Sequence, residues 1–168
     1  QAKLIHELQV HQIEMEMQSE SLKMAIAALE ASHNRYLDLY ELSPVGYLTL
    51  MPTGEIAEIN MTGALLFGLD RSGLLKRDFS AFICREDSER WRQFFQTLVR
   101  LGGDGKAEFR LARNDLNLID LRLDCLAVRR EPEEFVIHVA MTDITARMDA
   151  EKRLRDNEHL FRVIAERL

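Results

Sequence analysis

Apolar residues recur every three or four positions along residues 1–42, which contain neither proline nor glycine. This spacing is typical of an amphipathic helix, and the abundance of Ala, Leu, Met, Glu, Gln and Lys favours the same structure. A seven-residue repeat within the segment predicts a left-handed coiled coil, and therefore a dimer. The seam residues that we expect to meet a second chain are Leu8, Met15, Leu22 and Leu29.

This seam is imperfect. Polar residues such as His11 and Gln18 stand at seam positions, where they lower stability but help to fix the register of the two helices. A second apolar stripe contains Ile13, Met17 and Met24. The second stripe indicates that more than one face of the helix is covered.

The pattern changes to short strands after Pro44, because proline lacks the amide hydrogen that a helix needs. Two apolar runs, 46–50 and 55–59, flank a turn sequence and predict a β-hairpin. Asn60 is suited to begin a short helix that follows the hairpin. Residues 87–101 then predict a longer helix with one apolar side.

Three further strands follow the glycine-rich segment 102–105, which we expect to end that helix. Residues 107–113 and 118–130 alternate between apolar and polar, as a strand with one covered face does. Residues 135–142 are apolar on both faces apart from His138. Such a strand is expected in the middle of its sheet.

A second long helix begins near residue 144 and carries the seam residues Leu154 and Phe161. The order of helix, two strands, small helices, three strands and helix predicts an α+β domain with a five-stranded, mainly antiparallel sheet. The predicted parts are an N-terminal coiled-coil helix at 1–42, a globular domain at 43–143 and a C-terminal linker helix at 144–168.

The first residue is Gln1, and the last residues lie within a helical pattern. We therefore expect the chain to be a piece of a longer protein, in which the C-terminal helix leads to a further domain.

Charge and cysteine content restrict the partners and the compartment. The net charge of −6 argues against nucleic acid and anionic lipid as partners, because both require a cationic surface. No apolar run of about 18 residues occurs, so we expect no membrane contact by this chain. Cys84 and Cys125 show no CxxC spacing, which disfavours a zinc site or a disulfide framework and suits a reducing, cytoplasmic setting.

Five segments at the joints between the predicted elements carry a family resemblance. Their order and spacing resemble the PAS family over roughly residues 29–146. The family commonly has glycine where this chain has Lys76, so backbone strain is expected there if the position requires a positive φ. The five segments are Ser43-Pro44-Val45-Gly46-Tyr47, Gly54-Glu55-Ile56 followed by Asn60, Ala64-Leu65-Leu66-Phe67-Gly68, Phe79-Ser80-Ala81-Phe82-Ile83 and Asp143-Ile144-Thr145-Ala146-Arg147.

The resemblance implies a sheet with small helices on one face and a role in bacterial signal transduction. The expected function is that of a sensory and dimerisation module in a histidine kinase of a two-component system or in a diguanylate cyclase. Such a module would pass a change in its core or ligand through its helices to an output domain in the same chain. The alternative is a ligand-independent dimerisation or protein-interaction scaffold. No catalytic constellation or metal site is evident among the residues, so we expect no enzymatic activity from this chain.

The resemblance also implies a ligand pocket between the sheet and the small helices. Because the candidate residues are mostly apolar, a packed core and a site for a small apolar molecule remain alternatives. Cys84 lacks the sequence context of flavin-binding relatives, and residues 60–101 contain no histidine to ligate haem, so neither cofactor is expected. The candidate lining residues are Leu48, Ile59, Leu65, Leu66, Phe82, Phe94, Leu98, Phe109, Leu111, Leu123, Cys125 and His138.

The joint between the last strand and the C-terminal helix is the expected relay of the signal. Asp143 can cap the helix, and the resemblance implies that its carboxylate pairs with a basic side chain. Asp143 and Thr145 would then form the hinge. We expect a homodimer through the helices, with parallel and antiparallel arrangements both open.

Overall fold

The computed structural model describes residues 1–130 and 133–168, and its internal contacts divide the chain into the units 1–40 and 41–168. The first unit contains all of helix α1, Ala2–Glu41, except its last residue, and the helix is about 60 Å long at 1.5 Å per residue. None of its residues is buried. Among the described residues, no helix has the length and hydrophobicity required to cross a lipid bilayer.

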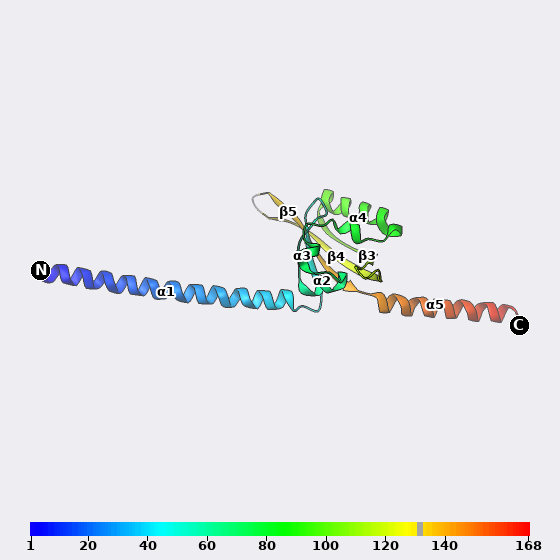
Figure 1. Cartoon of the computed structure of the whole chain (residues 1–168), viewed down its shortest axis with the longest axis horizontal. Coiled ribbons are helices and arrows are strands. Elements are labelled where there is room, and N and C mark those ends of the chain that lie inside the picture. The colour runs from blue at the N-terminus through cyan, green and yellow to red at the C-terminus, as the bar shows by residue number, and fades with distance from the viewer. Residues whose placement is uncertain (131–132) are drawn as a thin grey trace. The chain divides into compact units, whose positions relative to one another are not determined.

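The second unit contains a five-stranded sheet in the order β2-β1-β5-β4-β3 (Figure 1). Every neighbouring pair is antiparallel, as predicted. Strand β5 lies in the middle, which explains why its residues are apolar on both faces. The strands are β1 Gly46–Leu50, β2 Ile56–Ile59, β3 Gly103–Ala112, β4 Leu118–Arg130 and β5 Glu134–Asp143.

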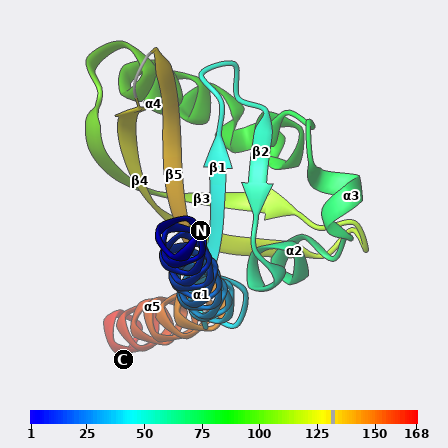
Figure 2. The same ribbon diagram turned by 90° about the vertical axis from the view of Figure 1, so that its left-hand side faces the viewer.

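The short helices and α4 cover one face of this sheet (Figure 2). Side chains from that face and from the helices form one apolar cluster, so the predicted α+β architecture is confirmed. Helix α5 continues from β5 and leaves the sheet. The helices are α2 Met61–Phe67, α3 Arg71–Leu74, α4 Ser88–Leu101 and α5 Thr145–Glu166, with 3-10 turns at Phe79–Phe82 and Arg85–Asp87.

The buried side-chain amide of Asn60 joins β1 to α2. Its Oδ1 accepts hydrogen bonds from the N–H groups of Gly63 and Tyr47, both at 2.8 Å. Its Nδ2 donates to the carbonyl of Val45 at 3.0 Å. The first of these bonds caps α2, as the sequence predicts, and the other two hold the start of the sheet against that helix.

Strand β3 begins earlier than predicted. Helix α4 ends before Gly102, but Gly103 and Gly105 already pair with β4 instead of forming only a turn. A Cβ atom at Gly105 would lie 3.1 Å from side-chain atoms of both Phe94 and Leu98. Glycine is therefore needed at this point of β3 because α4 packs directly on its backbone.

Lys76 has a φ of 64°, so the position that is commonly glycine in the PAS family does require a left-handed backbone here. Its N–H donates to the carbonyl of Ile56 at 2.8 Å, which holds the strained residue beside β2. A side chain in this conformation costs about 1 kcal/mol relative to glycine.

The Lys76→Gly variant should therefore unfold at a higher denaturant concentration than the wild type. The expected gain is below about 1 kcal/mol, because glycine also increases the entropy of the unfolded chain. Urea unfolding followed by circular dichroism measures the difference. Lys76→Ala is the matched control, since alanine removes the charge and keeps the strain. Equal stability of the Gly and Ala variants would contradict the prediction.

Candidate functional site

Most of the predicted pocket residues lie in the apolar core between the sheet and the helices. Leu66 and Phe94 are partly buried against this core. Such an arrangement brings side chains from four strands and three helical segments into one cluster. The buried members of the predicted set are Leu48, Ile59, Phe82, Leu98, Phe109, Leu111, Leu123 and Cys125.

Two of the predicted lining residues do not face this interior. Leu65 is 69% exposed on the outer side of α2. His138 alternates with Ile137 and Val139, which point into the core, so its side chain lies on the opposite face of β5. There its Nδ1 lies 3.1 Å from Oγ1 of Thr49, its partner on β1. The apolar pattern on both faces of β5 had concealed which face is covered by helices.

Aromatic rings fill the space between α4 and the sheet. Trp91 lies with its ring centroid 4.8 Å from that of Phe79 and 5.4 Å from that of Phe109. Phe67 packs edge-on against Phe82 at 4.9 Å. These contacts favour a well-packed core at this end of the domain, where aromatic side chains contribute large buried areas.

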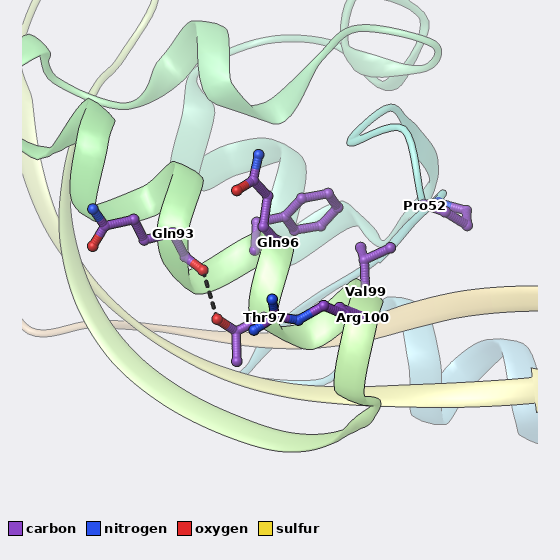
Figure 3. A pocket seen from close by; sticks show the side chains of 7 residues that line it. Pro52, Gln93, Gln96, Thr97, Val99 and Arg100 are labelled. Atoms are coloured by element: carbon purple, nitrogen blue, oxygen red, sulfur yellow. Dashed lines mark hydrogen bonds between the residues drawn. The ribbon is translucent and has the colours of Figure 1, made fainter.

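A surface groove of about 450 Å³ runs along α4 (Figure 3). Its wall is mixed, because Phe95 and Val99 are apolar whereas Gln93, Gln96 and Arg100 are polar. Pro52, from the turn between β1 and β2, closes one side. The amphipathic pattern of residues 87–101 reveals these polar positions, but only the fold brings them opposite the hairpin turn.

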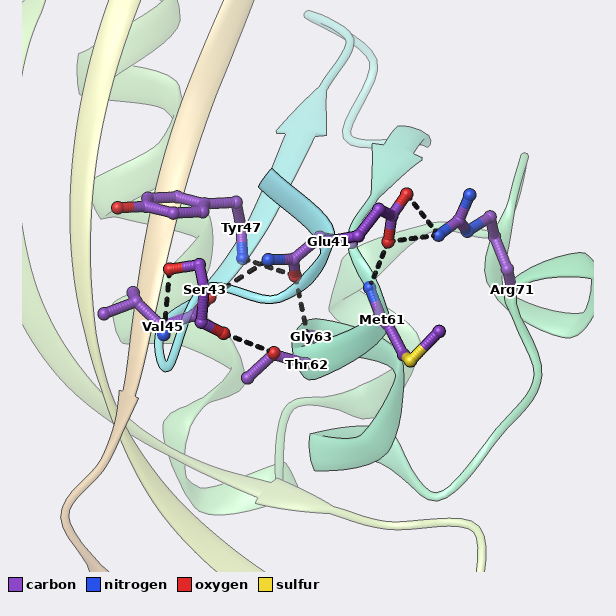
Figure 4. Close-up of polar contacts among 9 residues, drawn as sticks. Glu41, Ser43, Val45, Tyr47, Met61, Thr62, Gly63 and Arg71 are labelled. Atoms are coloured by element: carbon purple, nitrogen blue, oxygen red, sulfur yellow. Dashed lines mark hydrogen bonds and ion pairs between the residues drawn. The ribbon is translucent and has the colours of Figure 1, made fainter. Parts of the chain in front are cut away.

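The segment that follows α1 is held by polar contacts within the second unit (Figure 4). The carboxylate of Glu41 accepts from the N–H of Met61 at 2.8 Å and from Nη2 of Arg71 at 2.6 Å. The hydroxyl of Thr62 donates to the carbonyl of Ser43 at 2.5 Å. The start of α2 therefore anchors the chain where it enters the sheet.

The joint between β5 and α5 is built around Thr145. Its N–H and its hydroxyl both donate to Oδ1 of Asp143, at 2.9 and 2.6 Å. The same hydroxyl oxygen accepts from the N–H of Asp120 at 3.0 Å, and the N–H of Ile144 donates to the carbonyl of Asp120 at 2.9 Å. The two predicted relay residues are thus in direct contact, and both are joined to β4.

Asp143 does not have the predicted basic partner: its carboxylate forms no ion pair with any residue that the structure describes. Beside this joint it is Asp120 that forms an ion pair, and its two oxygens accept from Nε and Nη2 of Arg110 at 2.9 and 3.1 Å. Sequence reasoning missed this pair because alternation placed Asp120 on a solvent-facing side, whereas only 8% of it is exposed.

A charged cleft of about 390 Å³ surrounds this ion pair. Partial burial alone would raise the pKa of Asp87, but hydrogen bonds from the Arg110 N–H and from Arg90 outweigh it and hold that pKa below its ordinary value. Hydrogen bonding and charge from Asp120 raise the pKa of Arg110. The cleft therefore contains ionised groups that are already paired with one another. Its walls include Cys84, Asp87, Arg90, Arg110, Asp120 and Ile144.

The two thiols differ in their surroundings. Burial, with a smaller contribution from the charge of Asp124, raises the pKa of Cys125 to about 12. Burial and the nearby Glu86 also raise the pKa of Cys84, which is only partly buried. No cluster of His, Cys, Asp or Glu among the described residues has the arrangement of a metal site.

The seam residues on the two long helices are exposed in the single chain. Leu8, Met15, Leu22 and Leu29 on α1 are each between 59 and 71% exposed. On α5, Leu154 and Phe161 are 63 and 75% exposed. These apolar side chains are therefore available for contact with a partner.

Cys125 should resist thiol reagents as long as the domain is folded. At pH 8 a thiol with a pKa of about 12 is only roughly 0.01% thiolate, the reactive form. In the Cys84→Ser variant we expect no reaction with Ellman's reagent over an hour, followed by release of one equivalent in denaturant. Wild-type protein should show one slowly reacting thiol. Rapid reaction of native Cys84→Ser would contradict the burial of Cys125.

Comparison with known proteins provides independent evidence about the fold. No protein-family model matches the sequence, and no curated protein matches it either. Among solved structures, the PAS domain of an HTR-like protein from Haloarcula marismortui is 26% identical and superposes with a TM-score of 0.63. That match covers 73% of this chain and 99% of the Haloarcula domain.

Two further structures come from named signalling proteins. A PAS domain from a two-component sensor histidine kinase is 10% identical, with a TM-score of 0.57 over 68% of this chain and 97% of its own. The N-terminal domain of a diguanylate cyclase with PAS/PAC sensor from Marinobacter aquaeolei is 20% identical, with a TM-score of 0.55 over 62% and 98%. The strand order, the helices on one face and these superpositions agree. The chain therefore has the fold of a PAS domain.

Proposed function

We propose that this chain is the sensory and dimerisation module of a signalling protein, which passes a change in its core through α5 to a downstream output domain. The observation that carries the proposal is the joint at Thr145. Central strand β5 runs directly into α5, and the first turn of α5 is bonded to Asp120 of the neighbouring strand. A shift of the sheet would thus change the direction of α5.

The exposed seams support the dimer. Because apolar side chains on a long helix are stabilised when a second helix covers them, α1 is suited to pair with the α1 of a second copy. The seam on α5 would continue the pairing on the output side. PAS domains of similar fold occur in a sensor histidine kinase and in a diguanylate cyclase, which supports an output of this class.

The alternative is a scaffold that joins partners without sensing a ligand. Its supporting observation is the aromatic packing around Trp91, which leaves a small molecule little room at that end of the core. Native mass spectrometry of purified protein separates the two functions. A small molecule that repeatedly co-purifies favours sensing, and its consistent absence favours the scaffold.

Dimerisation through α1 predicts a strong effect of charge in the seam. The wild-type chain should have twice its 19.5 kDa mass in light scattering. The Leu22→Glu/Leu29→Glu variant should be a monomer, because it places like charges in an apolar interface. Gln9→Glu, which adds charge on the same helix outside the seam, is the control. A dimeric double variant, or a monomeric wild type, would refute the α1 interface.

The relay predicts that the joint controls how two α5 helices face each other. On a Cys84→Ser background, Leu154→Cys should form disulfide-linked dimers in much higher yield than Asp156→Cys, which lies on the opposite side of α5. Adding Thr145→Val removes the hydroxyl that contacts Asp143 and Asp120, at nearly constant volume. We expect the ratio of the two cross-linking yields to fall by about twofold or more, as for loss of a net hydrogen bond. An unchanged ratio would exclude Thr145 from the relay.

A further inference from the structure

We propose that Arg110 and Asp120 form a positioning pair that connects the N-terminal end of α4 with the first turn of α5. This inference rests on the proposed function for its role in signalling, and it names the route by which a change beneath α4 reaches the exit helix. The two residues are register partners on β3 and β4. The backbone of Arg110 binds the start of α4, and the backbone of Asp120 binds the start of α5. The two side chains bind each other.

The backbone of Arg110 holds the beginning of α4. Its N–H donates to Oδ2 of Asp87, the residue that precedes α4, at 2.8 Å. Its carbonyl accepts from the N–H of Cys84 at 2.9 Å. Asp87 also forms an ion pair with Arg90, one turn into the helix, at 3.0 Å. A displacement of this end of α4 would therefore move the backbone of Arg110 as well.

The backbone of Asp120 holds the beginning of α5. Its carbonyl accepts from Ile144, and its N–H donates to the hydroxyl of Thr145. These two bonds do not involve the carboxylate, so a substitution of the Asp120 side chain leaves the attachment of α5 intact. The side chain is free to serve only the link to β3.

The link between the two side chains is a bidentate ion pair, which fixes the arginine and the carboxylate in one relative orientation. Asp120 is buried, and its charge is stabilised at this place by Arg110. The neighbouring pair of Arg147 and Glu108, at 2.6 Å, adds a second tie between α5 and β3. Both of its members are about half exposed, so water screens this tie and it contributes less.

The core lies close to the α4 end of this route. Trp91 is in the first turn of α4, and its ring contacts Phe109, the residue before Arg110. The guanidinium of Arg90 lies 4.3 Å from the centre of the Phe109 ring. A change in packing around Trp91 thus acts on the helix end and on β3 together.

Hydrogen exchange of the full chain tests this route. Asp87→Ala removes the bond to Arg110 at α4, far along the chain from α5. We expect it to accelerate exchange of the amides of residues 147–150 by about threefold or more, the effect of weakening a hydrogen-bonded turn. The Met148 amide, which bonds the Ile144 carbonyl at 2.9 Å, reports the first turn of α5. Exchange in β5 should not change, which excludes global unfolding as the cause.

Asp120→Ala should abolish this response, so that adding Asp87→Ala to it has no further effect on residues 147–150. Arg110 is half exposed, so water can solvate its guanidinium in this variant. Glu89→Ala is the matched control at α4, because Glu89 pairs with Arg92 and not with β3. No acceleration by Asp87→Ala, or equal acceleration with and without Asp120, would overturn the proposal.

The measurement separates this inference from the proposed function. It needs neither a ligand nor a dimer, and the Leu22→Glu/Leu29→Glu chain can be used for the same comparison. If the wild-type chain is a monomer but α5 still responds to Asp87→Ala, the dimeric signalling module is refuted and the positioning pair is supported. If the wild-type chain is a dimer but α5 does not respond to Asp87→Ala, only the positioning pair is refuted.

Discussion

The antiparallel register of β3, β4 and β5 is the constraint on which the rest of this domain depends. Side chains alternate along a strand, so one register decides which residues enter the core and which charges meet on the outer face. It sets Phe109 opposite Leu121 beneath α4 and, one step along, Arg110 opposite Asp120. It also pairs Leu121 with Asp143, and so places the start of α5 beside β4. A slip by one residue would bury the charges and expose the core.

Both ends of the domain are attached through hydrogen bonds between strands and helices. At the entry, Asn60 connects β1 with α2, and Glu41 binds the first N–H of that helix. At the exit, Asp120 binds the first residues of α5. Directional bonds of this kind hold an angle between elements, which apolar contacts alone do not. The structure thus combines an apolar core with polar joints, which is the combination that the proposed relay requires.

The candidate site was only partly predictable from the sequence. Alternation in β3 and β4 identified Phe109, Leu111, Leu123 and Cys125 as inward-facing, and the structure buries all four. The same reasoning failed for His138, because a strand that is apolar on both faces contains no signal for which face the helices cover. Arg110 and Asp120 escaped notice because each looks like an ordinary surface charge until the other lies opposite it.

The sequence by itself determined the elements of this protein and their order. Proline and glycine positions, the heptad spacing of α1, and the alternation of β3 and β4 are local properties, and local steric preference and side-chain period suffice to read them. Tertiary structure decided which strands pair, where β3 begins, and which carboxylate at the α5 joint has a basic partner. Gly105 illustrates the reason, since its neighbours Phe94 and Leu98 come from a helix that reaches it only after folding. Such contacts depend on how close separate segments lie after folding, and the sequence pattern of one segment alone does not reveal them.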